Sequence, residues 1–447
     1  MSFEINHTHD AKARSWVESA NRSGSDFPIQ NLPYAVFRRR QSAEAWRGGI
    51  AIGDEVVDLA ALSQKGLLEG AAATATAACS QSTLNAFFET GPSAWQALRH
   101  GMFRLLGLDA NAEQQRAVAE CLVPQSGVEY AVPVQIGDYS DYYTSIYHAE
   151  NIGKLAGLNT ATPNFKWIPL AYHGRASSIG VSGQKFRRPL GQAKATDAQA
   201  PTLQPTQKLD YELELAIYVG KSNRLGQPVS VSDAEQHIFG IGLLNDWSAR
   251  DIQFWEMAPL GPFLGKSFAT TISPWIVSLE ALAPFRLPFE RPARDPQPLP
   301  YLDATTNRAA GAIDVTLEVW LGSSKQRALG APGSRVSSTS FKHQYWTVAQ
   351  MLAHHTINGC NLKVGDVLGT GTVSGPTVSE AGALIELALN GAAPVELATG
   401  EKRSFLEDGD TVSLRGYCEK PGFARIGFGE CRGEVLPSIS SGAAGAV

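Results

Sequence analysis

Four acidic side chains in three short segments could together hold a metal ion. Glu212 and Glu214 lie two apart in a strand-like run, so both side chains leave the same face of a sheet. Asp141 and Asp246 stand among aromatic and apolar residues, where an unpaired buried carboxylate costs several kcal/mol. A shared cation would satisfy all four, and oxygen ligands alone favour Ca²⁺ or Mg²⁺ over Zn²⁺. From spacing alone, a solvated strand face remains the commoner explanation of Glu212 and Glu214.

A histidine near this acidic set could act as a general base. His148 follows Asp141 by seven residues, so one segment could present both a metal ligand and a base. A general base needs a carboxylate that orients its far nitrogen, and Glu386, in an apolar run over 384–387 that we predict to be a strand, is a buried acid in need of a partner. A structural histidine is the alternative for His148, and we favour that interpretation for the pair 354–355.

A third group could stabilise developing negative charge. Residues 248–251 resemble a capping box and predict a short helix from Ala249, with Arg250, Gln253 and Met257 on one face. Together with Lys266, this face offers donors suited to an oxyanion or a carbanion; an exposed surface helix is the alternative. The nucleotide-binding patterns GxGxxG after a strand and GxxxxGK[ST] are absent, as is the GxSxG nucleophile turn.

The elements that carry these residues fall into two parts. Strands are predicted over 34–37 and 49–59, with Gly53 and Asp54 forming a hairpin turn, and helices over 62–116. The pattern breaks over 124–133, where we place a linker and the domain boundary.

The remainder mixes strands with a few capped helices. Capping boxes predict helices over 234–244 and from Thr347 to Asn358, and the glycine-rich stretch 368–375 predicts a tight turn after a strand, with backbone that approaches a ligand. Strands do not alternate regularly with helices, which favours an α+β, mostly β class. The predicted strands of this part are 210–219, 313–321, 383–389 and 411–417.

Composition limits the partners. The 447 residues include 38 basic and 43 acidic side chains, a net charge of 38 − 43 = −5, without a block of Lys or Arg. Nucleic acid and anionic membranes are therefore not expected as partners, and a small molecule is. Neither a signal peptide nor an apolar run of about 18 residues is found, so we expect a cytoplasmic protein with five buried free cysteines. Residues 1–24 and 438–447 are expected to be loosely held tails.

Long strings of sequence resemble the fumarylacetoacetate hydrolase family in the family's order, over residues 26–436. The resemblance implies an N-terminal SH3-like barrel domain with helices over 25–130, a larger mixed β-roll catalytic domain over 131–437, and a homodimer. The strings that carry it are residues 136–141, 172–178, 245–253, 259–268 and 354–362.

The resemblance also implies roles for individual residues. The expected Ca²⁺ ligands are Asp141, Glu212, Glu214 and Asp246. A Mg²⁺ position would be framed by Asp246, Lys266 and Thr270. His148 and Glu386 would activate water, and the charge would be stabilised by Arg250, Gln253 and Lys266. The expected substrate contacts are Tyr143, Tyr172, Gln253, Met257 and Thr372.

The implied reaction is the hydrolysis of a carbon–carbon bond in a 1,3-diketo acid, namely 4-fumarylacetoacetate and water to fumarate and acetoacetate in tyrosine and phenylalanine catabolism. Two positions depart from the family pattern: Gly157 stands in a shortened segment where an arginine would meet a substrate carboxylate, and Met257 replaces a tyrosine. Both departures affect the pocket, so a related acylpyruvate or diketo acid remains an alternative substrate. The sequence is also compatible with a decarboxylase, hydratase or isomerase of the wider superfamily, and with a metal-stabilised scaffold without activity.

Overall fold

The computed structural model describes residues 4–155, 157 and 161–439. Its smaller, N-terminal part is built on a five-stranded sheet in the order β4-β3-β2-β1-β5. The predicted hairpin at Gly53 and Asp54 is confirmed, since it joins β2 to β3. The strands are β1 (Tyr34–Arg39), β2 (Arg47–Ile52), β3 (Glu55–Asp58), β4 (Leu122–Pro124) and β5 (Val128–Ala131).

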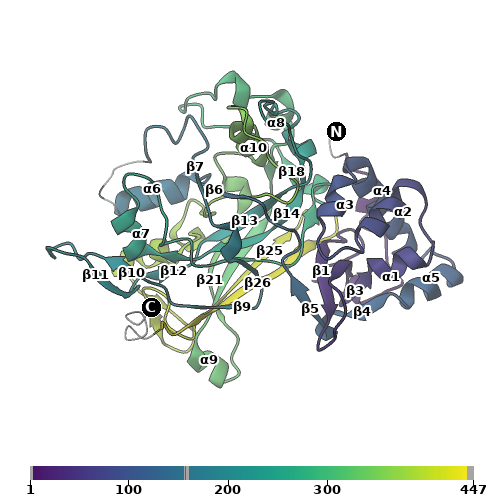
Figure 1. The fold of residues 1–447 in the computed structure, drawn as a ribbon, viewed down its shortest axis with the longest axis horizontal. Coiled ribbons are helices and arrows are strands. Elements are labelled where there is room, and N and C mark those ends of the chain that lie inside the picture. Colours follow the sequence, from purple (N-terminus) through teal and green to yellow (C-terminus); the bar gives the residue numbers. More distant parts are fainter. Residues whose placement is uncertain (1–3, 156, 158–160, 440–447) are drawn as a thin grey trace.

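Five helices belong to this part, as expected for residues 62–116, and most of them lie on its outer side (Figure 1). In the longest of them, Leu98, Met102, Leu105 and Leu106 form the buried face, which belongs to the same hydrophobic cluster as residues of the sheet. The helices are α1 (Leu59–Gln64), α2 (Gly70–Ala78), α3 (Asn85–Glu89), α4 (Pro92–Leu106) and α5 (Ala112–Ala119).

Two expectations for this part are wrong. Residues 4–24 are not a loose tail: Thr8, His9, Val17 and Ala20 are buried, and Asn6 donates a hydrogen bond to Glu280 of the larger part at 2.8 Å. The sequence did not reveal this order, because a segment held by polar contacts shows no apolar periodicity. The stretch 124–133 is not a linker either, because β5 pairs with β1. The expected C-terminal tail lies outside the described residues from 440 onward.

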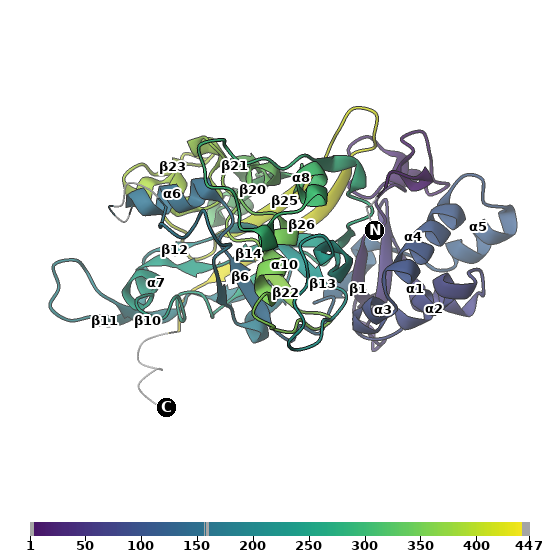
Figure 2. The same ribbon diagram turned by 90° about the horizontal axis from the view of Figure 1, so that it is seen from above.

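The larger part consists of two packed sheets (Figure 2). One has eight strands, in the order β7-β6-β22-β13-β14-β16-β8 with β17 beside β14; the other has the order β21-β20-β25-β26-β9. Leu243 of the first sheet lies against Gly416 of the second, where a Cβ would come within 2.9 Å of the leucine. The first sheet comprises β6 (Tyr139–Tyr142), β7 (Ala171–His173), β8 (Ile179–Val181), β13 (Leu213–Val219), β14 (Ile238–Asp246), β16 (Thr270–Ile272), β17 (Val277–Ser278) and β22 (Val367–Gly369). The second comprises β9 (Gln184–Arg187), β20 (Thr316–Gly322), β21 (Ser334–Ser340), β25 (Thr411–Cys418) and β26 (Ile426–Leu436).

Short helices and two-stranded pairs surround these sheets. The capping box predicted at Thr347 is confirmed, since Thr347 and Gln350 cap α10 reciprocally. The helices are α6 (Ile146–Leu155), α7 (Arg250–Glu256), α8 (Thr305–Ala310), α9 (Ser324–Ala328), α10 (Val348–Thr356) and α11 (Leu384–Leu387). The pairs are β10 (Leu190–Ala193) with β11 (Thr202–Pro205), β12 (Leu209–Asp210) with β15 (Ser248–Ala249), β18 (Arg286–Leu287) with β19 (Ala312–Ile313), and β23 (Val395–Glu396) with β24 (Lys402–Arg403).

Several predicted elements of this part are wrong. The helix expected over 234–244 is a short 3₁₀ turn (Ala234–His237) followed by β14, because burial of all nine β14 residues between neighbouring strands outweighs the helix signal. The strand expected over 383–389 contains helix α11. The helix α7 exists, but its capping box does not: the Ser248 side chain bonds Asp246 O instead. The expected strand over 210–219 is divided into β12 and β13, with Glu212 between them.

The two parts share a continuous core. Tyr34 of β1 bridges to Ile276 and packs on Phe239 of β14 in an edge-to-face contact at 5.3 Å. Four of the five free cysteines are buried as predicted, and Cys360 is partly exposed. Over the described ranges, no helix combines the length and the apolar character needed to cross a membrane.

Candidate active site and metal centre

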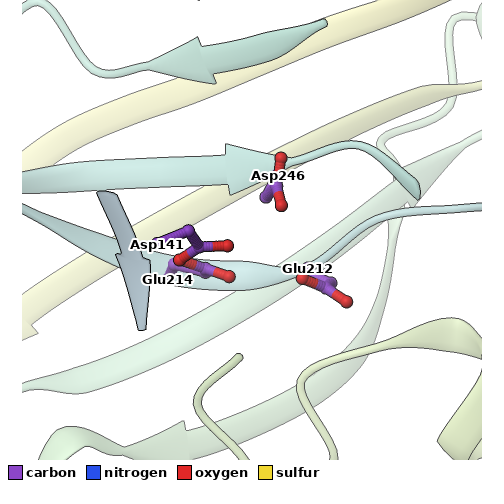
Figure 3. A group of neighbouring side chains, drawn as sticks. All are labelled: Asp141, Glu212, Glu214 and Asp246. Carbon is purple, nitrogen blue, oxygen red and sulfur yellow. The ribbon is translucent and has the colours of Figure 1, made fainter. Parts of the chain in front are cut away.

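Four buried carboxylates converge in the eight-stranded sheet (Figure 3). Asp141 comes from β6, Glu214 from β13, Asp246 from the end of β14, and Glu212 from the residues just before β13. One oxygen of each carboxylate lies within 4.8 Å of those of the other three. We call these four residues the carboxylate cage. The structure therefore brings together the acidic residues that the sequence suggested as metal ligands.

Two glycines make room for the cage. A Cβ at Gly369 of β22 would lie 2.6 Å from Asp141 Oδ1 and 3.1 Å from Glu214 Oε2, so only glycine fits between these strands. Gly371 has φ +75°, which favours glycine, and its backbone N–H donates to Glu214 Oε2 at 3.0 Å. The glycine-rich stretch thus follows a strand, as predicted, and its backbone reaches the cage.

Two cations neutralise one side of the cage. Lys266 Nζ donates to Glu212 Oε2 at 2.5 Å and to Asp246 Oδ2 at 2.7 Å, while Arg250 NH1 donates to Glu212 Oε1 at 2.6 Å. Thr270 donates to the other oxygen of Asp246 at 3.2 Å. Glu212 and Asp246 are therefore compensated by neighbouring donors.

The opposite side of the cage retains unpaired oxygens. Within the described chain, Asp141 Oδ1 and Glu214 Oε1 are buried and accept no hydrogen bond. Burial raises the pKa of Asp141 well above its usual range, and the charge of Asp246 raises it further; burial and the charge of Asp141 do the same for Glu214. The pKa of Glu212 is lowered instead, because Lys266 and Arg250 outweigh the effect of its burial. Unpaired buried oxygens surrounded by like charge fit a divalent cation.

His148 and Glu386 form a buried dyad. His148 Nδ1 lies 2.7 Å from Glu386 Oε2, and Asn151, one turn further along α6, donates to Glu386 Oε1 at 2.8 Å. Ser374 Oγ lies 3.0 Å from both carboxylate oxygens. Both partners are almost fully buried, at 3% exposure each. We call His148 and Glu386 the dyad.

The dyad has the electrostatics of a general base. Burial raises the pKa of Glu386, but the charge of His148 and the hydrogen bonds from His148, Asn151 and Ser374 lower it overall. An ionised Glu386 holds the proton of His148 on Nδ1, which leaves Nε2 free to accept another. When His148 is protonated, its charge also lowers the pKa of Glu212, so the dyad lies close enough to affect the cage.

The expected substrate contacts differ in how they are placed. The Tyr143 ring meets that of His148 edge to face at 5.3 Å, and Tyr172 OH donates to Asp246 at 2.8 Å. Thr372 Oγ1 is buried and bonds no group in the described ranges. Gln253 Oε1 accepts from Arg250 at 3.3 Å, whereas Met257 is 41% exposed at the end of α7. The departure at Gly157 borders residues 156 and 158–160, which lie outside the described residues.

Three residues of the site escaped sequence reasoning. Asn151 follows His148 by three positions, the spacing of one helical turn, so a correct helix assignment could have indicated it. Asp210 continues the alternation of Glu212 and Glu214 one step earlier. No sequence signal pointed to Ser374, whose role depends on a contact between distant segments.

Fold and site together define a mostly β protein with a buried cluster of four carboxylates that could hold a metal ion, and with a His–Glu dyad. The chain belongs to the fumarylacetoacetate hydrolase family: the model "Fumarylacetoacetate (FAA) hydrolase C-terminal" matches residues 139–436, and "Fumarylacetoacetase N-terminal" matches residues 30–133. The family resemblance noted in the sequence is thereby confirmed.

Curated relatives extend over almost the whole chain. A rice fumarylacetoacetase is 47% identical over 95% of this chain and 98% of its own length. The Caenorhabditis elegans and human fumarylacetoacetases are 48% and 44% identical, each over 93% of this chain and 97% of their own. Each of these comparisons covers at least 93% of this chain and at least 97% of the relative.

Proposed function

We propose that this protein is a metal-dependent hydrolase that cleaves a carbon–carbon bond of a 1,3-diketo acid. The proposed reaction converts 4-fumarylacetoacetate and water to fumarate and acetoacetate, a step of tyrosine and phenylalanine breakdown. The observation that carries the proposal is the 2.7 Å contact between His148 Nδ1 and Glu386 in a dyad that acts electrostatically on the carboxylate cage. Relatives that carry the name fumarylacetoacetase support the choice of substrate.

The cage residues Asp141, Glu212, Glu214 and Asp246 would hold Ca²⁺, and Asp246, Lys266 and Thr270 would frame a second position for Mg²⁺. Support for a cation comes from the unpaired oxygens of Asp141 and Glu214. When bound, such an ion supplies Lewis-acid polarisation of the diketone oxygens and attracts an anionic substrate to an acidic site.

Hydrolysis requires a base for water, and His148 is suited to that role. Glu386 fixes the proton on Nδ1, so Nε2 takes a proton from water as the water oxygen bonds the ketone carbon of the fumaryl group. Glu386 then stabilises the imidazolium that forms. The electron pair of the carbonyl moves onto its oxygen, which becomes an oxyanion.

Collapse of the oxyanion breaks the carbon–carbon bond and gives the two products. The carbonyl re-forms as a carboxyl group of fumarate, and the bonding pair leaves with the acetoacetate carbon as an enolate. Lys266 uses two of its three N–H donors on the cage and keeps the third for this charge, next to Arg250 and Gln253. Lys266 or a bound water delivers a proton to the enolate carbon. The proton that His148 took from water then restores the donor, so the protons balance.

Two pocket positions bear on substrate choice. Gly157 and Met257 replace side chains that the family pattern uses, and loss of a buried contact between arginine and carboxylate costs about 1.5–3 kcal/mol. Lys166 is engaged with Asp295 at 2.6 Å, so it is not a ready substitute for the arginine, whereas Lys154 is exposed. A related acylpyruvate or diketo acid is therefore the second candidate substrate.

Further features belong to the same proposal. We infer that the N-terminal five-stranded sheet is an SH3-like barrel, that the enzyme is a homodimer and that it works in the cytoplasm on a small diketo acid. The family resemblance supports these inferences. The absence of a concentrated basic block is what disfavours nucleic acid or an anionic membrane as a partner.

The test uses purified protein loaded with Ca²⁺ or Mg²⁺. We would follow the ultraviolet absorbance of fumarylacetoacetate beside simpler acylpyruvates, for the wild type and for His148→Ala. We expect fumarylacetoacetate to be cleaved with the highest kcat/KM, and His148→Ala to lose turnover by about 10²-fold or more while its metal content stays unchanged. Retained turnover in His148→Ala would sink the mechanism, and preference for another diketo acid would overturn the substrate.

A further inference from the structure

A single buried carboxylate joins the two halves of the site. Asp210 is fully buried, and its Oδ1 accepts the backbone N–H of Leu384 at 2.8 Å while its Oδ2 accepts that of Ile385 at 3.2 Å. The same Oδ2 accepts from Arg250 Nε at 2.9 Å. The donors come from segments more than 130 positions apart in the sequence, so this carboxylate links distant parts of the chain, beside the backbone bridge between Glu212 and Ala383.

On one side, Asp210 starts the helix that carries the general-base dyad. The first residues of a helix have backbone N–H groups without intrahelical partners, and the residue before α11, Ala383, has no side chain that can accept them. Asp210 accepts two of these N–H groups instead. Glu386 is the third residue of α11, so the carboxylate that orients His148 depends on the start of this helical turn.

On the other side, Asp210 fixes the cation. Arg250 is buried at 2% exposure, and its guanidinium lies between Asp210 and Glu212. With both carboxylates in place, the guanidinium plane is held by two neighbours at once, which a single ion pair does not achieve. Asp210 thus determines the position of Arg250 relative to Glu386.

We propose that Asp210 is a positioning residue that sets the geometry between the dyad and Arg250. The inference rests on the proposed hydrolytic function and adds to it a residue that acts through Glu386 and Arg250 without contacting substrate. Because displacement of reacting groups by about 1 Å can cost 10²-fold in rate, loss of Asp210 is expected to reduce kcat by about 10- to 100-fold.

The variant Asp210→Asn isolates this role. Asparagine keeps the size of the side chain and one acceptor oxygen for Leu384 N–H, but its NH₂ group can accept neither from the Arg250 guanidinium nor from Ile385 N–H. The chain contains a matched control in Asp410, which is also buried and accepts from Arg403 Nε at 2.8 Å and from Glu407 N at 2.8 Å. Asp410→Asn breaks the same kind of pair outside the site.

Three measurements test the proposal. First, kcat for fumarylacetoacetate is measured for both variants at a temperature where all are folded; Asp210→Asn should lose about 10- to 100-fold and Asp410→Asn less than about two-fold. Second, Asp210→Asn is combined with Glu386→Gln, and the double variant should be less than additive because both changes act on the dyad. Third, the downfield proton resonance of His148 Nδ1–H is recorded without substrate, and should shift or broaden only in Asp210→Asn.

Some outcomes would overturn the proposal: an unchanged kcat and resonance in Asp210→Asn, equal losses in the two asparagine variants, or full additivity with Glu386→Gln. If Asp210→Asn does not fold, Asp210→Glu retains the charge but moves it by one methylene, and the same loss of kcat is expected. The resonance needs no turnover. A wild type that cleaves no diketo acid therefore refutes the proposed function, while the resonance still tests the positioning role.

Discussion

Glu386→Gln removes the charge of the dyad while keeping its shape, and the hydrogen bonds of Glu386 determine the consequence. One oxygen faces His148 Nδ1 at 2.7 Å, and the other accepts from the amide of Asn151 at 2.8 Å. Glutamine has one acceptor and one donor, so it can satisfy only one of these neighbours. If its NH₂ group faced Asn151 with that amide in its present orientation, two donors would meet, at a cost of about 1–3 kcal/mol.

The glutamine therefore turns its NH₂ group towards His148. Nδ1 must then accept, the ring proton moves to Nε2, and His148 can no longer take a proton from water through that atom. A preference of about 1–3 kcal/mol for this arrangement leaves only about one part in 5 to 150 in the productive form, since 1.4 kcal/mol is tenfold. Loss of the carboxylate also removes stabilisation of the imidazolium, so kcat should fall by about 10²- to 10⁴-fold in total.

The assay is the ultraviolet loss of fumarylacetoacetate at saturating substrate, with metal content measured on the same sample. Glu280→Gln is the matched control, because Glu280 is also buried and its Oε1 also faces a histidine, His100 Nε2, at 2.6 Å. The control should keep kcat within about two-fold, since Glu280 lies near the junction with the N-terminal part. A kcat for Glu386→Gln close to the wild-type value, with correct metal content, would refute the role of Glu386.

Three further predictions concern stability and metal binding. His100 and Arg99 lower the pKa of Glu280 to about 2 against the effect of burial, so its contribution of about 3 kcal/mol is present above pH 4.5 and disappears as the pH falls towards 2. Acid unfolding should therefore show the gap between the wild type and Glu280→Gln closing over that range, and a constant gap would contradict this. Gly369→Ala places a Cβ against the cage, and calorimetric titration should show Ca²⁺ or Mg²⁺ affinity weakened by about 10-fold or more; unchanged affinity would contradict the proposed ligand set. Thr347→Ala removes the cap of α10 and should lower the free energy of unfolding by about 1–2 kcal/mol in urea titrations, whereas no change would show that the cap is dispensable.

The sequence predicted an element correctly where the local preference of its residues and their surroundings in the fold favour the same structure. The hairpin at Gly53 and Asp54 and the capped helix at Thr347 have this property. The segment 238–246 does not, because a capping box precedes an apolar run that is compatible with helix or strand. Tertiary packing decides the outcome, because all nine residues are buried between neighbouring strands. Gly240 permits this packing, since a Cβ there would lie 2.4 Å from the carbonyl oxygen of Val277.

The prediction of a strand over 384–387 was wrong because a distant residue determines the local structure. The residues alternate in part, which suits a strand, yet Asp210 accepts the backbone N–H groups of Leu384 and Ile385 and starts a helical turn. That contact spans more than 170 positions, so no local pattern could have revealed it. The predicted type of secondary structure was wrong, but the structure still places Glu386 beside His148, as the sequence suggested.

The candidate site was more predictable than the elements that carry it. Acidic residues in apolar surroundings need partners wherever the chain places them, and this requirement indicated Asp141 and Asp246. Glu212 and Glu214 were added because they share one face of a strand, and the family resemblance implied the same four ligands. Ser374 has no comparable signal, because a serine can be satisfied almost anywhere in a protein. Its role depends on the path of the chain after β22.

The central claim is that the carboxylate cage binds a divalent cation that the carbon–carbon hydrolase requires. The most direct measurement removes metal from the purified protein with a chelator and follows fumarylacetoacetate cleavage as Ca²⁺ or Mg²⁺ is added back. We predict that cleavage disappears with the metal, that it returns on addition of either ion, and that Asp141→Asn weakens this return. Undiminished cleavage by the metal-free protein would contradict the claim.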